Sequence, residues 1–128
     1  MREILKSLGS EKRYTFIARV TVFSFKKGFI NKLPLRTILL TKVMCEGKPI
    51  TDHVWMNCGR RFYGLLPQRF QWLQFDARVK IYKRKDGSTD YKLSYPSKVS
   101  IVSKKSNKRT WNRKIKEMGL EPRKRISF

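Results

Sequence analysis

A period-two alternation of apolar and polar side chains runs through much of this chain and restricts it to sheet structure. The clearest example is Leu73 to Tyr82, where Phe75 and Val79 lie on one face while Arg78 and Lys80 lie on the other. Successive side chains of a strand point to opposite faces of the sheet. The spacing therefore predicts a strand with one buried face.

Four further segments are predicted as strands because β-branched and aromatic residues are concentrated in them: residues 14–25, 35–44, 52–57 and 91–102. Turn chemistry precedes the third and the last of the five strands, at Glu46–Pro49 and Lys85–Ser88. Residues Gly59–Phe70 do not alternate, and they predict a short helix or a loop. Pro96 predicts an edge or a bulge in the last strand.

The order of these segments predicts an all-β fold, a five-stranded Greek-key OB-fold barrel with a short helix between strands 3 and 4. An SH3-like barrel is the alternative, although it usually lacks that helix. The expected organisation is an N-terminal extension over residues 1–12, an OB-fold nucleic-acid-binding domain over 13–102 and a basic C-terminal tail over 103–128.

The tail contains one helical signal. Trp111, Ile115 and Met118 follow an i, i+4, i+7 spacing, which predicts a helix over Arg109–Met118 that ends at Gly119. The spacing is compatible both with a helix docked on the barrel and with a free tail.

The positive charge of the chain indicates its class of partner. The 128 residues include 31 Lys and Arg against 9 Asp and Glu, a formal net charge of +22. Residues 1–102 carry 21 basic and 7 acidic side chains, a net of +14, and residues 103–128 carry 10 and 2, a net of +8. Such a surplus makes the folded chain repel itself. Nucleic acid is the expected partner, because neutralised phosphates release counterions.

Solubility and membrane binding account for the charge less well than nucleic acid does. Solubility alone requires only a few charges. No long helix with a basic and an apolar face favours a membrane surface, and no apolar run is long enough to span a bilayer. The first residues also lack the apolar stretch of a secretory signal. A cytoplasmic location is expected, where Cys45 and Cys58 are thiols rather than a disulfide.

Catalytic chemistry is poorly represented, and the sequence predicts a binding protein rather than an enzyme. His53 has no serine or cysteine motif near it that would form a triad. Two Cys and one His fall short of a four-ligand zinc site. The carboxylates are scattered rather than clustered for magnesium, and no glycine-rich phosphate loop is present. We therefore expect no catalytic residue, no metal and no cofactor.

Binding chemistry is much better represented. A single nucleic-acid strand exposes both phosphates and base faces, so its binder needs cations interleaved with aromatic side chains. An OB-fold binds its ligand across the central strands, between the first–second and fourth–fifth loops, and both loops are basic here. For each residue, core packing or simple exposure is the structural alternative. The predicted nucleic-acid-binding residues are Arg19, Phe23, Phe25, Lys26, Lys27, His53, Trp55, Arg60, Arg61, Arg78, Lys80, Tyr82, Lys83, Arg84 and Lys85.

Three short blocks of the sequence follow one another in a recognisable order: Thr51–Asn57 followed by Phe62, Leu73–Tyr82 and Asp90–Val99. The first contains Asp-His-Val-Trp and the second contains Phe-Asp-Ala-Arg-Val-Lys. Over residues 14–102, this series resembles a family of small proteins encoded by phages, plasmids and chromosomal cassettes of Gram-positive bacteria, sometimes near a replicative helicase gene. The resemblance implies an OB-fold and single-stranded DNA binding, as a replication accessory of the mobile element.

The partner is not settled by these signals alone. RNA is one alternative, because composition does not report a contact with a 2′-hydroxyl. An adaptor for a helicase or polymerase is another. Housekeeping bacterial single-strand-binding proteins recruit partners through an acidic tip, whereas residues 123–128 of this chain are basic. The tail is therefore expected to contact phosphates or an acidic protein surface.

Overall fold

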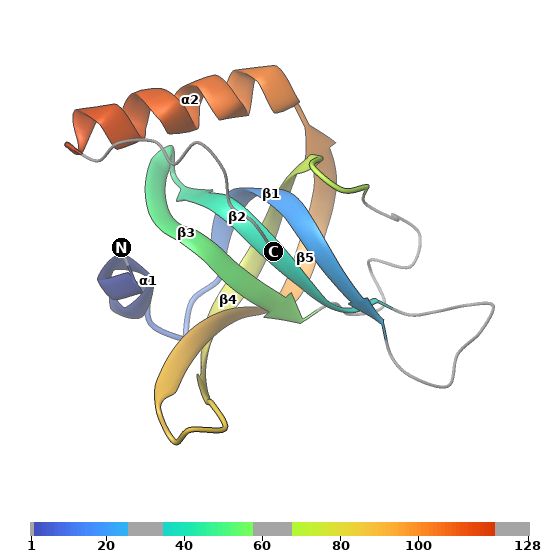
Figure 1. The fold of residues 1–128 in the computed structure, drawn as a ribbon, viewed down its shortest axis with the longest axis vertical. Coiled ribbons are helices and arrows are strands. Elements are labelled where there is room, and N and C mark those ends of the chain that lie inside the picture. Colours follow the sequence, from blue (N-terminus) through green and yellow to red (C-terminus); the bar gives the residue numbers. More distant parts are fainter. Residues whose placement is uncertain (1, 26–34, 58–67, 120–128) are drawn as a thin grey trace.

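A computed structural model describes residues 2–25, 35–57 and 68–119 of the chain. Its strands and its C-terminal helix follow the predicted order, and a further helix lies at the N-terminal end (Figure 1). The predicted helix between the third and fourth strands falls largely in 58–67, outside the described residues. The elements are α1 (Arg2–Leu8), β1 (Tyr14–Phe25), β2 (Leu35–Cys45), β3 (Lys48–Asn57), β4 (Trp72–Lys83), β5 (Thr89–Val102) and α2 (Lys104–Glu117).

The five strands form a closed barrel in the order β1-β2-β3-β5-β4, and β4 pairs with β1 to complete the ring. Four of the pairings are antiparallel, and only β3 and β5 run parallel, through Met56 and Leu93. This arrangement matches the five-stranded OB-fold barrel that the sequence predicts. Closure also removes the exposed edges that an open sheet of the described strands would have.

Bulges change which residues reach each face of the barrel. Thr21 is the extra residue of β1, since Val20 pairs with Leu40 while Val22 pairs with Leu39. On β5, the pairing slips between Ser94 and Ser97, which confirms the bulge predicted from Pro96. A bulge bends its strand and turns the following side chains to the other face, so the alternation of β1 does not extend through its whole length.

The turn between β2 and β3 follows from its two central residues. Glu46 and Gly47 have φ values of 52° and 75°. Two consecutive positive φ values define the type I′ turn, whose twist matches that of the flanking strands and which favours glycine. β3 therefore begins at Lys48, four residues before the predicted start at Asp52.

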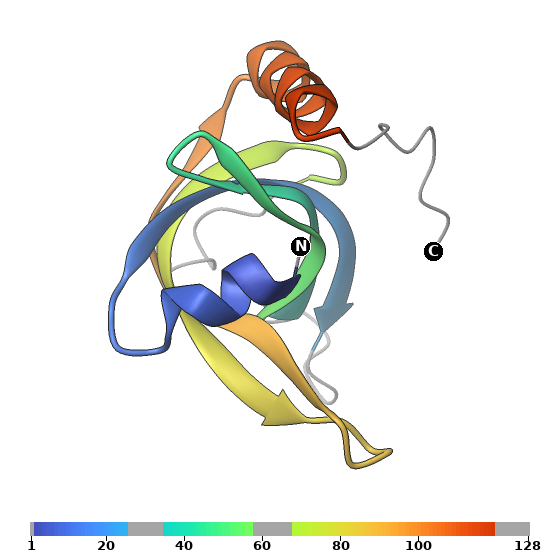
Figure 2. The same cartoon turned by 90° about the vertical axis from the view of Figure 1, so that its left-hand side faces the viewer.

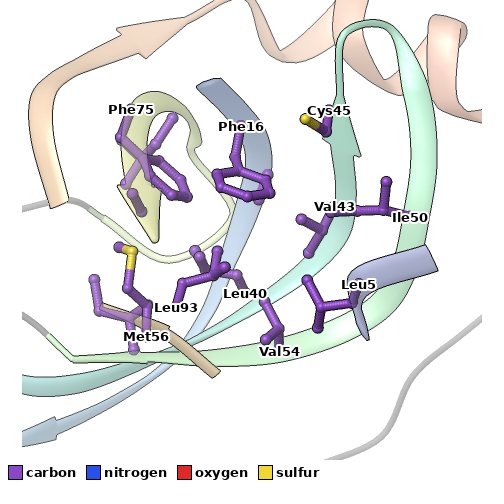
Figure 3. Close-up of a cluster of buried hydrophobic side chains, with 14 of the residues drawn as sticks. Leu5, Phe16, Leu40, Val43, Cys45, Ile50, Val54, Met56, Phe75 and Leu93 are labelled. Carbon is purple, nitrogen blue, oxygen red and sulfur yellow. The ribbon is translucent and has the colours of Figure 1, made fainter. Parts of the chain in front are cut away.

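The barrel core is built from the apolar face of each strand. Phe16 and Phe75 stack with their ring centroids 5.9 Å apart, and the buried cluster continues through β2 and β3 (Figure 3). Figure 2 shows α1 lying across one open end of the barrel. Leu5 of this helix is fully buried among the core residues (Figure 3). The mixed, polar composition of residues 1–12 did not predict this contact.

Helix α2 packs on the outside of the barrel. Trp111 and Ile115 are buried against Met44 and Trp72, which lie on β2 and β4. The hydroxyl of Ser103 accepts a hydrogen bond from the Ser106 backbone N–H and caps the first turn. The helix therefore starts five residues earlier than the predicted Arg109, and it docks rather than remaining free. Neither described helix has the length and apolar character needed to cross a bilayer.

Cys45 is a free thiol in the buried cluster, at the end of β2. Burial, aided by the charge of Glu46, raises its pKa to about 11. Cys58 lies outside the described residues.

Truncation of Trp111 tests whether the docked helix contributes to stability. Trp111→Ala is expected to lower the free energy of unfolding by about 3–5 kcal/mol, because a large buried side chain leaves a cavity. Met118→Ala is the control, since Met118 is 44% exposed, and it is expected to change stability by less than about 0.5 kcal/mol. Urea titration followed by circular dichroism measures both. Equally small effects of the two substitutions would show that the packing of Trp111 does not contribute to stability.

Candidate nucleic-acid interface

The outer face of β1, β2 and β3 carries a first row of polar residues. Arg19 pairs in register with Thr41, and Thr41 pairs with His53. The Arg19 Nε donates a hydrogen bond to the Thr41 hydroxyl, 3.1 Å away, and the hydroxyl oxygens of Thr21 and Thr41 are 2.9 Å apart. Partial burial lowers the pKa of Arg19. These contacts hold the guanidinium in one orientation through two threonines that are themselves buried. Two predicted site residues, Arg19 and His53, lie on either side of Thr41 in this row.

A second row on the same face contains an aromatic side chain. Trp55 pairs in register with Leu39, and Leu39 pairs with Val22. Trp55 is half-buried, while its neighbours Val54 and Met56 on the opposite face are fully buried in the core. Trp55 therefore lies on the face of its strand opposite the core.

The outer face of β4 and β5 carries the cations. Arg78 and Lys80 are exposed, and Lys80 pairs in register with Lys92 of β5. The Lys92 ammonium lies 5.3 Å from the centroid of the Tyr82 ring, a cation–π distance. Burial and the neighbouring charge of Lys80 lower the pKa of Lys92. Among the described residues, no carboxylate forms an ion pair with Arg78, Lys80 or Lys92.

The parallel pairing of β3 with β5 joins these two areas. Met56 pairs with Leu93, and the Asn57 Nδ2 donates a hydrogen bond to the Ser94 hydroxyl, 3.4 Å away. This register places Trp55 of β3 next to Lys92 of β5. We call the resulting surface the basic outer face, which comprises Arg19, His53, Trp55, Arg78, Lys80, Tyr82 and Lys92. Thr41 lies beneath this surface and is fully buried.

The β4–β5 hairpin is anchored by a buried acid. The guanidinium of Arg84 forms an ion pair with Asp90, and the Tyr82 hydroxyl donates a hydrogen bond to the same carboxylate, 3.4 Å away. The hydrogen bond that Arg84 donates to Asp90 raises the pKa of Arg84. Arg84 is thus held by the protein itself, whereas Lys83 and Lys85 are exposed at the tip.

Several predicted site residues lie where the structure gives little or no description. Phe23 and Phe25 belong to β1, and their backbones pair with Ile38 and Leu35. Their side chains lie outside the described part of the structure. The same holds for all of Lys26, Lys27, Arg60 and Arg61.

Sequence reasoning missed Lys92, although a signal for it was present. Lys92 and Ser94 alternate with Tyr91 and Leu93 within the strand predicted over residues 91–102. The alternation assigns Lys92 to the outer face. Its position beside Trp55 required the parallel β3–β5 pairing, which no local pattern reports.

Comparison with known proteins adds little at the sequence level. No family model matches the chain, and no curated protein is similar to it. Among solved structures, the chain is similar to Rim1, a mitochondrial single-stranded DNA-binding protein from S. cerevisiae. The identity is 13% and the TM-score is 0.37, over 72% of this chain and 95% of that one.

The lowered pKa of Lys92 gives a prediction about the free protein. A lysine with a lowered pKa loses its proton at a lower pH than the ordinary value of 10.5, so Lys92 is expected to titrate below that value. Lys80→Gln removes one of the two causes, and it is expected to move the titration midpoint of Lys92 upward. NMR titration of ¹³C-labelled lysine side chains measures both midpoints. A midpoint that does not move in the variant would show that Lys80 does not act on Lys92.

Proposed function

We propose that the protein binds single-stranded DNA through the basic outer face, with little dependence on sequence. The observation that carries this proposal is the position of Trp55 next to Lys92 and Lys80, across three adjacent strands. An unpaired strand presents base faces and phosphates at close intervals. The aromatic ring can contact a base face, and the two cations beside it can contact phosphates.

The electrostatics of the face favour an anionic ligand. Lys80 and Lys92 are neighbours on adjacent strands, and their repulsion contributes to the lowered pKa of Lys92. A phosphate placed between them would relieve that repulsion, and the release of its counterions would add affinity. The unfavourable free energy of holding like charges together in the fold is thus recovered on binding.

The composition of the face also supports weak sequence dependence. Sequence is read mainly through hydrogen bonds to base edges. The basic outer face instead presents cations and aromatic rings, and stacking on a ring tolerates any base. The family resemblance over residues 14–102 extends the proposal to a replication accessory of a mobile genetic element, with a helicase or polymerase as a second partner.

Binding of fluorescein-labelled single-stranded DNA, duplex DNA and RNA of equal length tests the proposal. Anisotropy titrations over a range of salt concentrations are expected to show tighter binding of the single DNA strand than of the duplex. They are also expected to show a steep loss of affinity with salt. Equal binding of duplex would leave only bulk charge as the source of affinity. Tighter binding of RNA would assign the surface to that ligand instead.

A substitution at Trp55 separates stacking from charge. Trp55→Ala is expected to weaken single-strand binding by about 1–3 kcal/mol, the usual value of one stacked base, whereas Trp55→Phe keeps most of the affinity. Tyr95→Ala is the matched control, because Tyr95 is an exposed aromatic residue outside the basic outer face. Wild-type affinity in Trp55→Ala would exclude Trp55 from the interface.

A further inference from the structure

Phe70 lies immediately before β4 and has a backbone conformation that bulky residues rarely adopt. Its φ is 71°, in the left-handed region. Two backbone hydrogen bonds hold it there: the Phe70 N–H donates to the Val20 carbonyl at 2.7 Å, and the Val20 N–H donates to the Gln71 carbonyl at 2.8 Å. The side chain is still 41% exposed. Burial of the ring therefore does not account for the strain, and residues in such conformations cluster at binding sites.

Two guanidinium groups lie over the Phe70 ring. The Cζ of Arg19 is 5.4 Å from the ring centroid and the Cζ of Arg69 is 4.9 Å from it. Each contact is a cation–π interaction. The ring therefore holds two positively charged guanidinium groups close to each other. Arg19 is also held by the hydrogen bond that it donates to Thr41.

Two lysines extend this group of charges toward α2. Lys42 lies in the β2 bulge with a φ of 52°, between the pairings of Thr41 and Met44. Burial lowers its pKa, and so do the charges of Arg19 and of Lys108 on α2. Within the described ranges, none of Arg19, Lys42, Arg69 and Lys108 forms an ion pair with a carboxylate.

Helix α2 presents further cations at its start. Lys104, Lys105, Lys108 and Arg109 are exposed in its first two turns, and the first turn contains no acid. Cations at the N-terminus of a helix oppose its dipole. An anion bound nearby would compensate this unfavourable arrangement.

We propose that Arg19, Arg69, Lys42 and Lys108 form a phosphate-binding subsite, with Phe70 as the spacer, that leads single-stranded DNA from the barrel onto α2. This inference rests on the proposed function and adds to it a path for the DNA strand. The subsite takes the phosphodiester backbone rather than a base, because guanidinium groups already cover the ring. Their planar N–H donors suit phosphate oxygens. Arg19 belongs to both areas, so the subsite is continuous with the basic outer face.

Charge-matched variants of the full-length chain test the subsite. Arg69→Gln and Lys108→Gln each remove one of its cations, and Lys6→Gln removes the same charge from the exposed surface of α1. Anisotropy titrations with labelled oligo(dT) give the slope of log K against log salt. The first two variants are expected to make the slope shallower by about 0.7 each, the value of one phosphate contact on a single strand. Equal slopes in all three variants would overturn the proposal.

A glycine at position 70 tests the spacer without straining the backbone. Phe70→Gly suits the positive φ and removes the ring, so affinity is expected to fall about two- to fivefold, the equivalent of one or two exposed cation–π contacts, at unchanged thermal stability. Tyr95→Gly is the control, because the backbone of Tyr95 is also in the left-handed region, with a φ of 55°. Unchanged affinity in a folded Phe70→Gly protein would contradict the role of the ring.

An abasic oligonucleotide distinguishes phosphate from base. The loss caused by Arg69→Gln is expected to persist with an abasic strand, and its disappearance would overturn the phosphate assignment. The outcomes also separate the two proposals. Failure of the wild-type protein to bind single strands would reject the proposed function itself. Binding that depends on Trp55 but not on Arg69 and Lys108 would reject only the subsite.

Discussion

The parallel pairing of β3 with β5 is the contact on which the candidate site depends. It closes the barrel through Met56 and Leu93, two buried core residues. The same pairing places Trp55 beside Lys92 on the outer face. One strand register therefore determines both which residues fill the apolar interior and which residues form the proposed binding surface. A shift of one residue in either strand would send the aromatic and the cation to opposite sides.

Much of this arrangement could be predicted from the sequence, because local patterns report local structure. The alternation over Leu73–Tyr82 gave β4 to within one residue at each end, and the five strands follow in the predicted order. What could not be predicted depends on contacts between distant segments. Leu5 enters the core from a polar segment, and Lys92 meets Trp55 only across the closing pair. Phe70 lies at the end of a stretch without periodicity, where no pattern marks a positive φ.

The fold determines where the positive charges of the chain lie. Like charges gather on the outside of the barrel, where burial and, after it, the neighbouring cations lower the pKa of Lys42 and of Lys92. Two acids of β4 and β5 pair with cations of the protein itself: Asp90 with Arg84, and Asp76 with Lys98. Helix α2, predicted as part of a basic tail, is buried through Trp111 and Ile115. Its cations are consequently held in place beside the barrel, where they can extend a binding surface.

An NMR titration of the ¹⁵N-labelled protein with unlabelled oligo(dT) tests the central claim, that a single strand lies along the basic outer face. The amide shifts of Arg19, Trp55, Lys80 and Lys92 are expected to move together and to saturate at one oligonucleotide concentration. The amides of α1, at the open end of the barrel, are expected to remain in place (Figure 2). Shifts confined to residues 103–128, with none on β3 or β5, would contradict the account, because binding would then reside in the charge of the C-terminal segment alone.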